Sequence, residues 1–134
     1  MEVRSPVTGT IKEVKKIEQN GVSVWQISIT HLKNAHDFVK SPCDALIESI
    51  DVVDGDGHSF KLQTSDKKRV DLVVLNSKNL QDLYLMPGDR VLLGAKLFKY
   101  KPTTGLTLLI DGSCLLFAQA NDKMVQSSSL IGKF

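Results

Sequence analysis

Two short patterns each occur twice in this chain, and their order constrains the fold more than any other feature. The first runs over residues 5–14 as SPVTGTIKEV and returns 36 residues later, over residues 41–50, as SPCDALIESI. The second begins over residues 88–91 as GDRV and returns 33 residues later, over residues 121–124, as NDKM. Repeats spaced 33–36 residues apart indicate duplicated supersecondary units. Because both copies of the first pattern precede both copies of the second, we expect two intertwined sheets related by a pseudo-two-fold axis.

The turn chemistry is repeated along with the hydrophobic residues. Proline, here Pro6 and Pro42, fixes its own φ and offers no backbone donor, which suits the entry to an edge strand. Gly88 can adopt a positive φ in the turn that follows Pro87, and Asn121, from the residue type that most often replaces glycine there, holds the matching place. The sequence therefore predicts matching corners in the two copies.

Length and composition predict one domain over residues 1–134. A chain of this size buries roughly 65–70% of its extended surface and needs no disulfide. Cys43 and Cys114 lie in apolar stretches, so we expect buried free thiols and a cytoplasmic location. No stretch has the length of a membrane span or the character of a secretory leader. The net charge of +2, from 17 basic and 15 acidic residues, is too balanced to predict nucleic-acid binding.

Strand signals dominate the chain, and Asn20-Gly21 is the strongest hairpin signal because both central residues of a type I′ turn need a positive φ. A short helical turn could form around Leu80, Leu83 and Tyr84. A sheet of this size must hide its edges, so we expect a compact all-β barrel or sandwich. The predicted strands cover residues 9–17, 22–30, 43–52, 58–64, 69–75, 89–93, 96–101, 106–110, 114–118, 123–126 and 130–133.

Taken together, these motifs resemble the barrel-sandwich hybrid folds, and among them the phosphatidylserine decarboxylases. Residues 5–9 are similar to that family's first proline turn. Residues 24–44 are similar to its strand, histidine-bearing loop and second proline turn, and residues 86–97 to the approach to its processing site. The resemblance implies an all-β barrel-sandwich hybrid with internal pseudo-two-fold duplication.

The same resemblance implies a lyase that makes its own pyruvoyl cofactor by cleaving before a serine, with an aspartate and a histidine activating the hydroxyl. This chain departs from the pattern at all three positions. Thr8 stands for the aspartate, Lys40 for the histidine, and the segment around Thr103 has no Gly-Ser where cleavage would occur. We therefore expect a non-catalytic relative, a pseudoenzyme without a cofactor, that binds a small amine, an amino-lipid headgroup or a protein partner.

An enzyme remains the competing hypothesis. Gly112-Ser113 precedes an apolar strand, and His36 lies in the loop that should carry a base, so Ser113 and His36 are the candidate catalytic residues of a pyruvoyl-dependent decarboxylase. The spacing after Gly94 is too long for the family's cleavage motif, which favours a hairpin turn at Gly112-Ser113.

The remaining candidates are weaker. His58 lies in a segment similar to the first histidine strand of sugar phosphotransferase phosphocarriers, but the strand expected to face it, residues 71–75, has no second histidine. Lys67 resembles the lysine at a lipoyl carrier's hairpin tip, in the wrong order relative to Gly88. The three histidines have no metal-site spacing, so we expect no metal. Peripheral membrane contact and a homodimer built on exposed strand edges are both compatible with the sequence.

Overall fold

The computed structural model describes residues 1–31, 38–53, 57–75, 83–99 and 105–134. Within these ranges the chain is all-β, as predicted, and the residues form thirteen strands and no helix. The strands are β1 (Glu2–Arg4), β2 (Gly9–Gln19), β3 (Val22–His31), β4 (Phe38–Lys40), β5 (Ala45–Val53), β6 (Gly57–Gln63), β7 (Arg69–Val74), β8 (Arg90–Val91), β9 (Lys96–Lys99), β10 (Leu106–Asp111), β11 (Leu115–Leu116), β12 (Lys123–Met124) and β13 (Leu130–Lys133).

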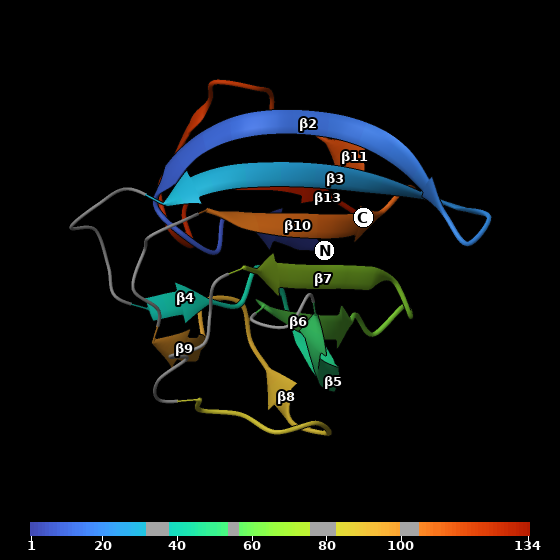
Figure 1. The fold of residues 1–134 in the computed structure, drawn as a ribbon, viewed down its shortest axis with the longest axis vertical. Helices are drawn as coiled ribbons and strands as arrows, with labels where there is room; N and C mark the ends of the chain where they lie inside the picture. Colours follow the sequence, from blue (N-terminus) through green and yellow to red (C-terminus); the bar gives the residue numbers. More distant parts are fainter. Residues whose placement is uncertain (32–37, 54–56, 76–82, 100–104) are drawn as a thin grey trace.

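Eight of these strands form one antiparallel sheet in the order β12-β2-β3-β10-β7-β6-β5-β8. The long β2–β3 hairpin arches over one end, so the sheet curls into a half-barrel (Figure 1). Two small sheets complete the body: β1-β13-β11 and the two-stranded ribbon β4-β9. The chain termini lie close together, because Phe134 N donates a 2.9 Å hydrogen bond to Met1 O.

The two copies of the first pattern have the same backbone irregularity. The β2–β3 register shifts between Ile11 and Glu13, and the β5–β6 register shifts between Ile47 and Ser49, which are the matching positions 36 residues later. A bulge inserts one residue and turns the strand, so both Ile11 and Val14 can face the core. Ile11 is fully buried and Val14 packs against the core.

The two copies of the second pattern meet the first in the same way. Lys123 and Met124 pair with Thr10 and Gly9 in β2, while Arg90 and Val91 pair with Leu46 and Ala45 in β5. Equivalent backbone hydrogen bonds close both junctions: Ile11 N to Asp122 O (2.9 Å) and Ile47 N to Asp89 O (2.8 Å). Counted inward from its two edges, the eight-stranded sheet has corresponding strands at the same positions. β12 corresponds to β8, β2 to β5 and β3 to β6.

One hydrophobic cluster fills the space between the half-barrel and the two small sheets. Phe60 of β6 and Phe98 of β9 stack at its centre, with ring centroids 4.6 Å apart and planes inclined by 12°. Val14, Ile50 and Leu116 pack against this cluster and are partly buried. The buried apolar side chains of the strands include Ile11, Val24, Ile27, Ile29, Ile47, Leu62, Leu72, Val74, Val91, Leu97, Leu108, Ile110 and Ile131.

The predicted turns agree with the structure. Asn20 and Gly21 have φ values of 54° and 78°, and Gly88 and Asn121 have 97° and 75°. The sequence missed β1 and β4, since strands of three residues leave no alternation to detect. In the predicted helical turn, Leu80 lies outside the described residues, while Leu83 and Tyr84 lie in no helix.

Candidate functional site

The two Ser-Pro corners lie against each other and exchange hydrogen bonds. Lys40 N donates to Pro6 O at 3.1 Å, and Arg4 N donates to Pro42 O at 2.8 Å. Within each corner the serine hydroxyl is buried and donates to a carbonyl two residues ahead, from Ser5 Oγ at 2.7 Å and from Ser41 Oγ at 2.7 Å. These serines therefore maintain the turns, and their hydroxyls are already engaged.

At the first corner, Thr8 Oγ1 accepts a 3.0 Å hydrogen bond from Gln126 N. The Gln126 side chain is 7% exposed, and its Nε2 donates to Pro6 O at 2.8 Å and to Phe38 O at 2.6 Å. Within the described ranges, the buried Gln126 Oε1 and the buried Ser127 Oγ have no hydrogen-bond partner. Thr8, which stands for the aspartate of the resembled family, thus anchors a turn here.

At the second corner, the Asp44 carboxylate accepts the hydrogen bond that Thr8 accepts at the first. Asp44 Oδ1 accepts a 2.7 Å hydrogen bond from Leu93 N, the counterpart of Gln126 N. A groove of about 400 Å³ opens beside it, between the start of β5, the β6–β7 turn and β8. We call it the Asp44 groove, and its polar lining residues are Asp44, Gln63, Thr64, Ser65, Lys67 and Arg90.

Ser113 lies in a turn at the other end of the sheet. Its backbone N and its Oγ both donate to Asp111 Oδ1, at 2.9 and 2.7 Å. Partial burial opposes ionisation of Asp111, but these two hydrogen bonds and the nearby Lys68 hold its carboxyl pKa below the usual value. Ser113 is thus a turn residue bonded to an ionised carboxylate.

The predicted catalytic residues do not all come together in the described structure. Lys40 and Thr8 belong to the paired corners, next to the end of β3 where His31 pairs with Gly9. Asp111 pairs with Val24 near the other end of β3, and at about 3.3 Å per residue Ser113 lies roughly 20 Å away along the strand. His36 and Thr103 lie outside the described residues.

Structural roles account for the two cysteines, Lys67 and Trp25. Burial, with a smaller contribution from Asp44, raises the pKa of the Cys43 thiol to about 12, and burial raises that of Cys114 to about 11, so both thiols stay protonated. Lys67 lies in the β6–β7 turn with a φ of 62°. The half-buried Trp25 donates from Nε1 to Cys114 O at 3.2 Å.

Gln126 is the residue that sequence reasoning missed at these corners. It follows Asn121 in the second pattern at the place where the first copy has Leu93. A polar side chain in a position that is apolar in the other copy was the available signal.

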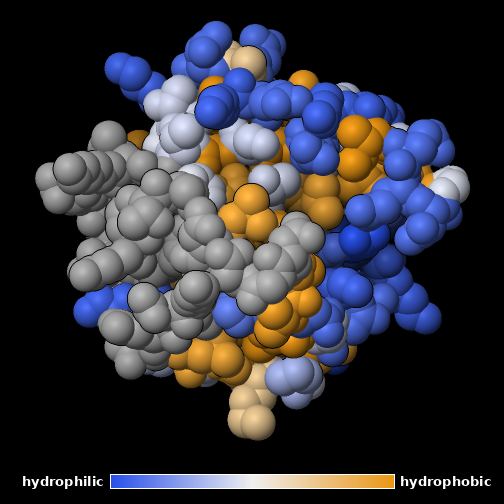
Figure 2. Space-filling view, viewed as in Figure 1, coloured by the Kyte–Doolittle hydropathy of each residue, from blue (hydrophilic) through white to orange (hydrophobic). Residues whose placement is uncertain are grey.

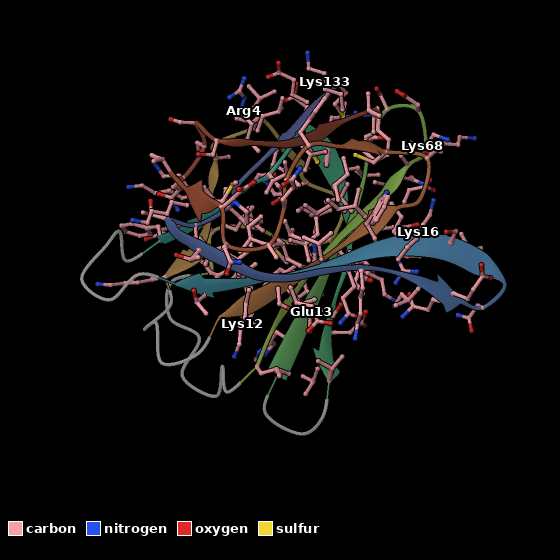
Figure 3. The ribbon with its side chains drawn as sticks, turned by 90° about the horizontal axis from the view of Figure 1, so that it is seen from above. Arg4, Lys12, Glu13, Lys16, Lys68 and Lys133 are labelled. Atoms are coloured by element: carbon pink, nitrogen blue, oxygen red, sulfur yellow. The ribbon has the colours of Figure 1, made fainter. Side chains whose placement is uncertain are left out.

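Charges of both signs are interleaved along β2 and across the β1–β13 edge (Figure 3). Lys12, Glu13 and Lys16 follow one another along β2 in that view. Lys15 pairs with Glu13 at 3.1 Å, and Arg4 pairs with Glu2 at 2.7 Å. Both surfaces therefore carry carboxylates among their cations.

Among the described residues, no helix could cross a membrane, and no group of three or more metal-ligating side chains lies together. No protein-family model and no curated protein matches this chain.

Proposed function

We propose that this chain is a duplicated barrel-sandwich hybrid domain that acts as a non-catalytic binding module for a small zwitterionic amine, of the kind found in amino-lipid headgroups. The binding site is the Asp44 groove. The resemblance to phosphatidylserine decarboxylases suggested this ligand class, and the groove's mixture of charges is the observation that carries it.

The matched corners support the duplicated origin. Met86 N donates to Asp89 Oδ2 at 2.9 Å, and 33 residues later Gln119 N donates to Asp122 Oδ2 at 2.9 Å. The Thr8 and Asp44 side chains each accept from a backbone N–H of the facing loop. Unrelated segments would have little reason to repeat the same side-chain-to-backbone bond at the same offset.

The chemistry of the groove fits a zwitterion. A carboxylate such as Asp44 attracts a primary ammonium group, while the guanidinium of Arg90 and the ammonium of Lys67 can bind a carboxylate or phosphate. Thr64 and Ser65 line the same wall, where Thr64 Oγ1 accepts from Lys68 N and Ser65 Oγ donates to Asp66 Oδ1. At about 400 Å³ the groove is within the range of small-ligand sites.

The positions of Thr8 and Ser113 support a binding role over self-processing. Thr8 has no ionisable group, and its hydroxyl accepts the Gln126 N–H. Ser113 is held in its turn by Asp111, far along the strand from Thr8. An acid, a base and a nucleophile that act on one bond must lie within hydrogen-bond reach of it.

Calorimetric titration with soluble headgroup analogues tests the proposal. We expect phosphoserine and phosphoethanolamine to bind the intact chain, and phosphocholine, whose quaternary ammonium has no donor, to bind more weakly. Asp44→Asn keeps an oxygen for Leu93 N but removes the charge, so it should weaken binding about tenfold or more. Arg90→Gln should do the same.

Lys123→Gln is the matched control, because Lys123 holds the place of Arg90 at the other corner, and it should leave binding unchanged. No binding of either analogue, or equal losses in Arg90→Gln and Lys123→Gln, would refute the Asp44 groove as the site. An intact mass of 14.8 kDa is expected; two fragments divided at Gly112-Ser113, one with a carbonyl-reactive terminus, would support the pyruvoyl enzyme instead.

A further inference from the structure

The β4–β9 ribbon has a face that the groove does not use. Val39, Leu97 and Phe98 turn into the core and are fully buried. The two strands pair with a register shift between Val39 and Lys40, a bulge that lets the neighbours Leu97 and Phe98 both face the core. The other residues of the ribbon are Lys96, which is exposed, and Phe38, Lys40 and Lys99, which are partly exposed, and we call these four the basic ribbon.

Cross-strand pairing brings three cations together on this ribbon. Lys40 lies opposite Lys96, and Lys99 lies opposite Phe38. Lys96 Nζ lies 4.3 Å from the centre of the Phe38 ring. Within the described part of the chain, none of the three lysines forms an ion pair with a carboxylate. Like charges opposite one another destabilise a ribbon, so an anionic partner would reduce the repulsion between these lysines.

Exposed apolar side chains adjoin these cations. The segment before β8 runs beside β9, since Tyr84 N donates to Leu97 O at 3.1 Å, and the Tyr84 ring lies 6.0 Å from that of Phe38. Tyr84 is 51% exposed, Leu83 45% and Met86 71%. Figure 2 shows apolar surface along the lower part of this face, where Figure 1 draws β9 and the approach to β8.

We propose that the basic ribbon and the Leu83–Met86 segment dock the protein on an anionic lipid bilayer. Lysines near a membrane surface are attracted by acidic headgroups, tyrosine favours the interfacial layer, and aliphatic side chains enter the acyl boundary. Leu83 and Met86 favour a bilayer over single-stranded nucleic acid, which binds through stacked aromatic rings and a continuous cationic groove. The proposal does not depend on the Asp44 groove.

Flotation of the full chain with vesicles tests it. Vesicles of phosphatidylcholine with 30% phosphatidylglycerol should carry the protein upward, while pure phosphatidylcholine vesicles should not. Phosphatidylglycerol has no amine, so a zwitterion site does not explain binding to it. Moderate salt should reduce the bound fraction, because exposed charges are screened. Failure of the wild-type chain to float at low salt would overturn the proposal.

Two matched triple variants locate the contact. Replacing Lys40, Lys96 and Lys99 by Gln should weaken vesicle binding roughly a hundredfold, from three lysines near the surface. Replacing the exposed Lys12, Lys123 and Lys133 by Gln removes the same charge and should leave most binding intact. Equal losses would show a net-charge effect and refute the ribbon as the docking surface.

The apolar part of the surface needs its own variant. Leu83→Ser with Met86→Ser changes exposed side chains, so the fold should persist, and vesicle binding should fall at least tenfold without a change in its salt dependence. Unchanged binding would refute insertion. Binding of a single-stranded oligonucleotide in preference to vesicles would overturn the membrane assignment, and circular dichroism confirms that each variant is folded.

Discussion

The two outer ribbons of the molecule, β1–β13 and β4–β9, occupy matching places but have different surfaces. In β1–β13 the carboxylate of Glu2 lies 2.7 Å from Arg4 and opposite Lys133, and β11 adds a third strand along the edge of β13. In β4–β9 the outward positions hold Lys40, Lys96 and Lys99, and among the described residues β4 and β9 pair with each other and with no further strand. One backbone plan therefore supports a three-stranded edge of mixed charge in one half and a cationic surface in the other.

The interiors of the two ribbons differ as much as their surfaces. Phe98 of β9 pairs with Val39, and at the matching place of β13 Gly132 pairs with Val3. Phe98 fills the core of the ribbon that has no third strand among the described residues, while Gly132 leaves room for β11. The third strand of the β1–β13 ribbon therefore depends on the small size of Gly132.

The largest expected effect is in the ribbon that depends on its aromatic residue. Phe98→Ala removes a fully buried ring stacked on Phe60, so we expect the free energy of unfolding to fall by about 3–5 kcal/mol in urea titration. Phe117→Ala removes a ring that is 48% exposed and should change stability much less. A loss below 1 kcal/mol at Phe98 would contradict its role as the core of this ribbon.

The matching change in the other ribbon adds a group instead of removing one. A Cβ at residue 132 would lie 2.6 Å from Cys114 Sγ and 2.7 Å from Leu115 O, so Gly132→Ala should cost about 1–3 kcal/mol by overpacking. Adding Cys114→Ala should recover only part of that loss, because the Leu115 carbonyl remains. Thermal denaturation of the single and double variants measures both, and no loss in Gly132→Ala would show that β11 does not pack against this position.

The next prediction compares Asp71 of β7 with Asp111 of β10, its neighbour in the sheet. Asp71 is 1% exposed, and Arg69 Nη2 lies 2.5 Å from its Oδ2. Its Oδ1 has no hydrogen-bond partner in the described part of the chain. Burial raises the pKa of the Asp71 carboxyl, although Arg69 and Lys61 oppose the shift. Its contribution to stability is therefore greatest below the unfolded-state pKa and is lost as pH rises through the folded-state value.

Asp71→Asn removes the ionisation, so we expect a gain in stability at pH 7 that disappears as the pH falls to the unfolded-state pKa of about 4. Asp111 has a lowered pKa, and its stabilising effect is present at neutral pH and lost as pH falls through the folded-state value. Asp111→Asn should therefore lower stability at pH 7. Urea titrations at several pH values measure both, and the same sign in the two variants at pH 7 would contradict this comparison.

A smaller effect tests whether the corners are equivalent. Asp89 and Asp122 each accept a 2.9 Å hydrogen bond from the backbone N–H three residues earlier. Because both sites are exposed, Asp89→Ala and Asp122→Ala should each cost about 0.5–1 kcal/mol, and the two losses should agree closely in chemical denaturation. Losses that differ by more than 1 kcal/mol would show that the two corners are not energetically equivalent.

Local chemistry was predictable from the sequence, and long-range pairing was not. The Asn20-Gly21 hairpin and the positive φ at Gly88 and Asn121 follow from residues adjacent in the chain. Gln126, in contrast, binds carbonyls 120 and 88 residues away, and no local pattern identifies such partners.

The basic ribbon could not be predicted from the sequence for the same reason. Lys40 and Lys96 are far apart in the sequence, and only the β4–β9 register places them opposite each other. In the Asp44 groove, Lys67 likewise comes from the β6–β7 turn and Arg90 from β8. The sequence predicted the corners that position these sites, and pairing across the sheets decided which side chains meet there.

The smallest expected effect concerns the loop that follows each copy of the second pattern. Gly94 has a φ of 87° and its counterpart Ser127 has a φ of 61°. The left-handed conformation costs a residue with a Cβ about 1–2 kcal/mol, whereas glycine costs about 0.5–1 kcal/mol through the chain entropy lost on folding. The Ser127 hydroxyl is buried and has no partner among the residues that the structure describes, so we expect its removal to break no hydrogen bond.

We therefore expect Ser127→Gly to stabilise the protein by a few tenths of a kcal/mol up to about 1 kcal/mol. Gly94→Ala, the matched reverse change, should destabilise it by a similar amount through backbone strain, because the nearest atom to a new Cβ is Ser127 Oγ at 3.6 Å, an ordinary contact distance. Thermal melts of both variants in one buffer measure the pair. A destabilised Ser127→Gly would mean that the buried hydroxyl has a partner, such as a bound water, and the two loops would then differ in polar contacts as well as in backbone strain.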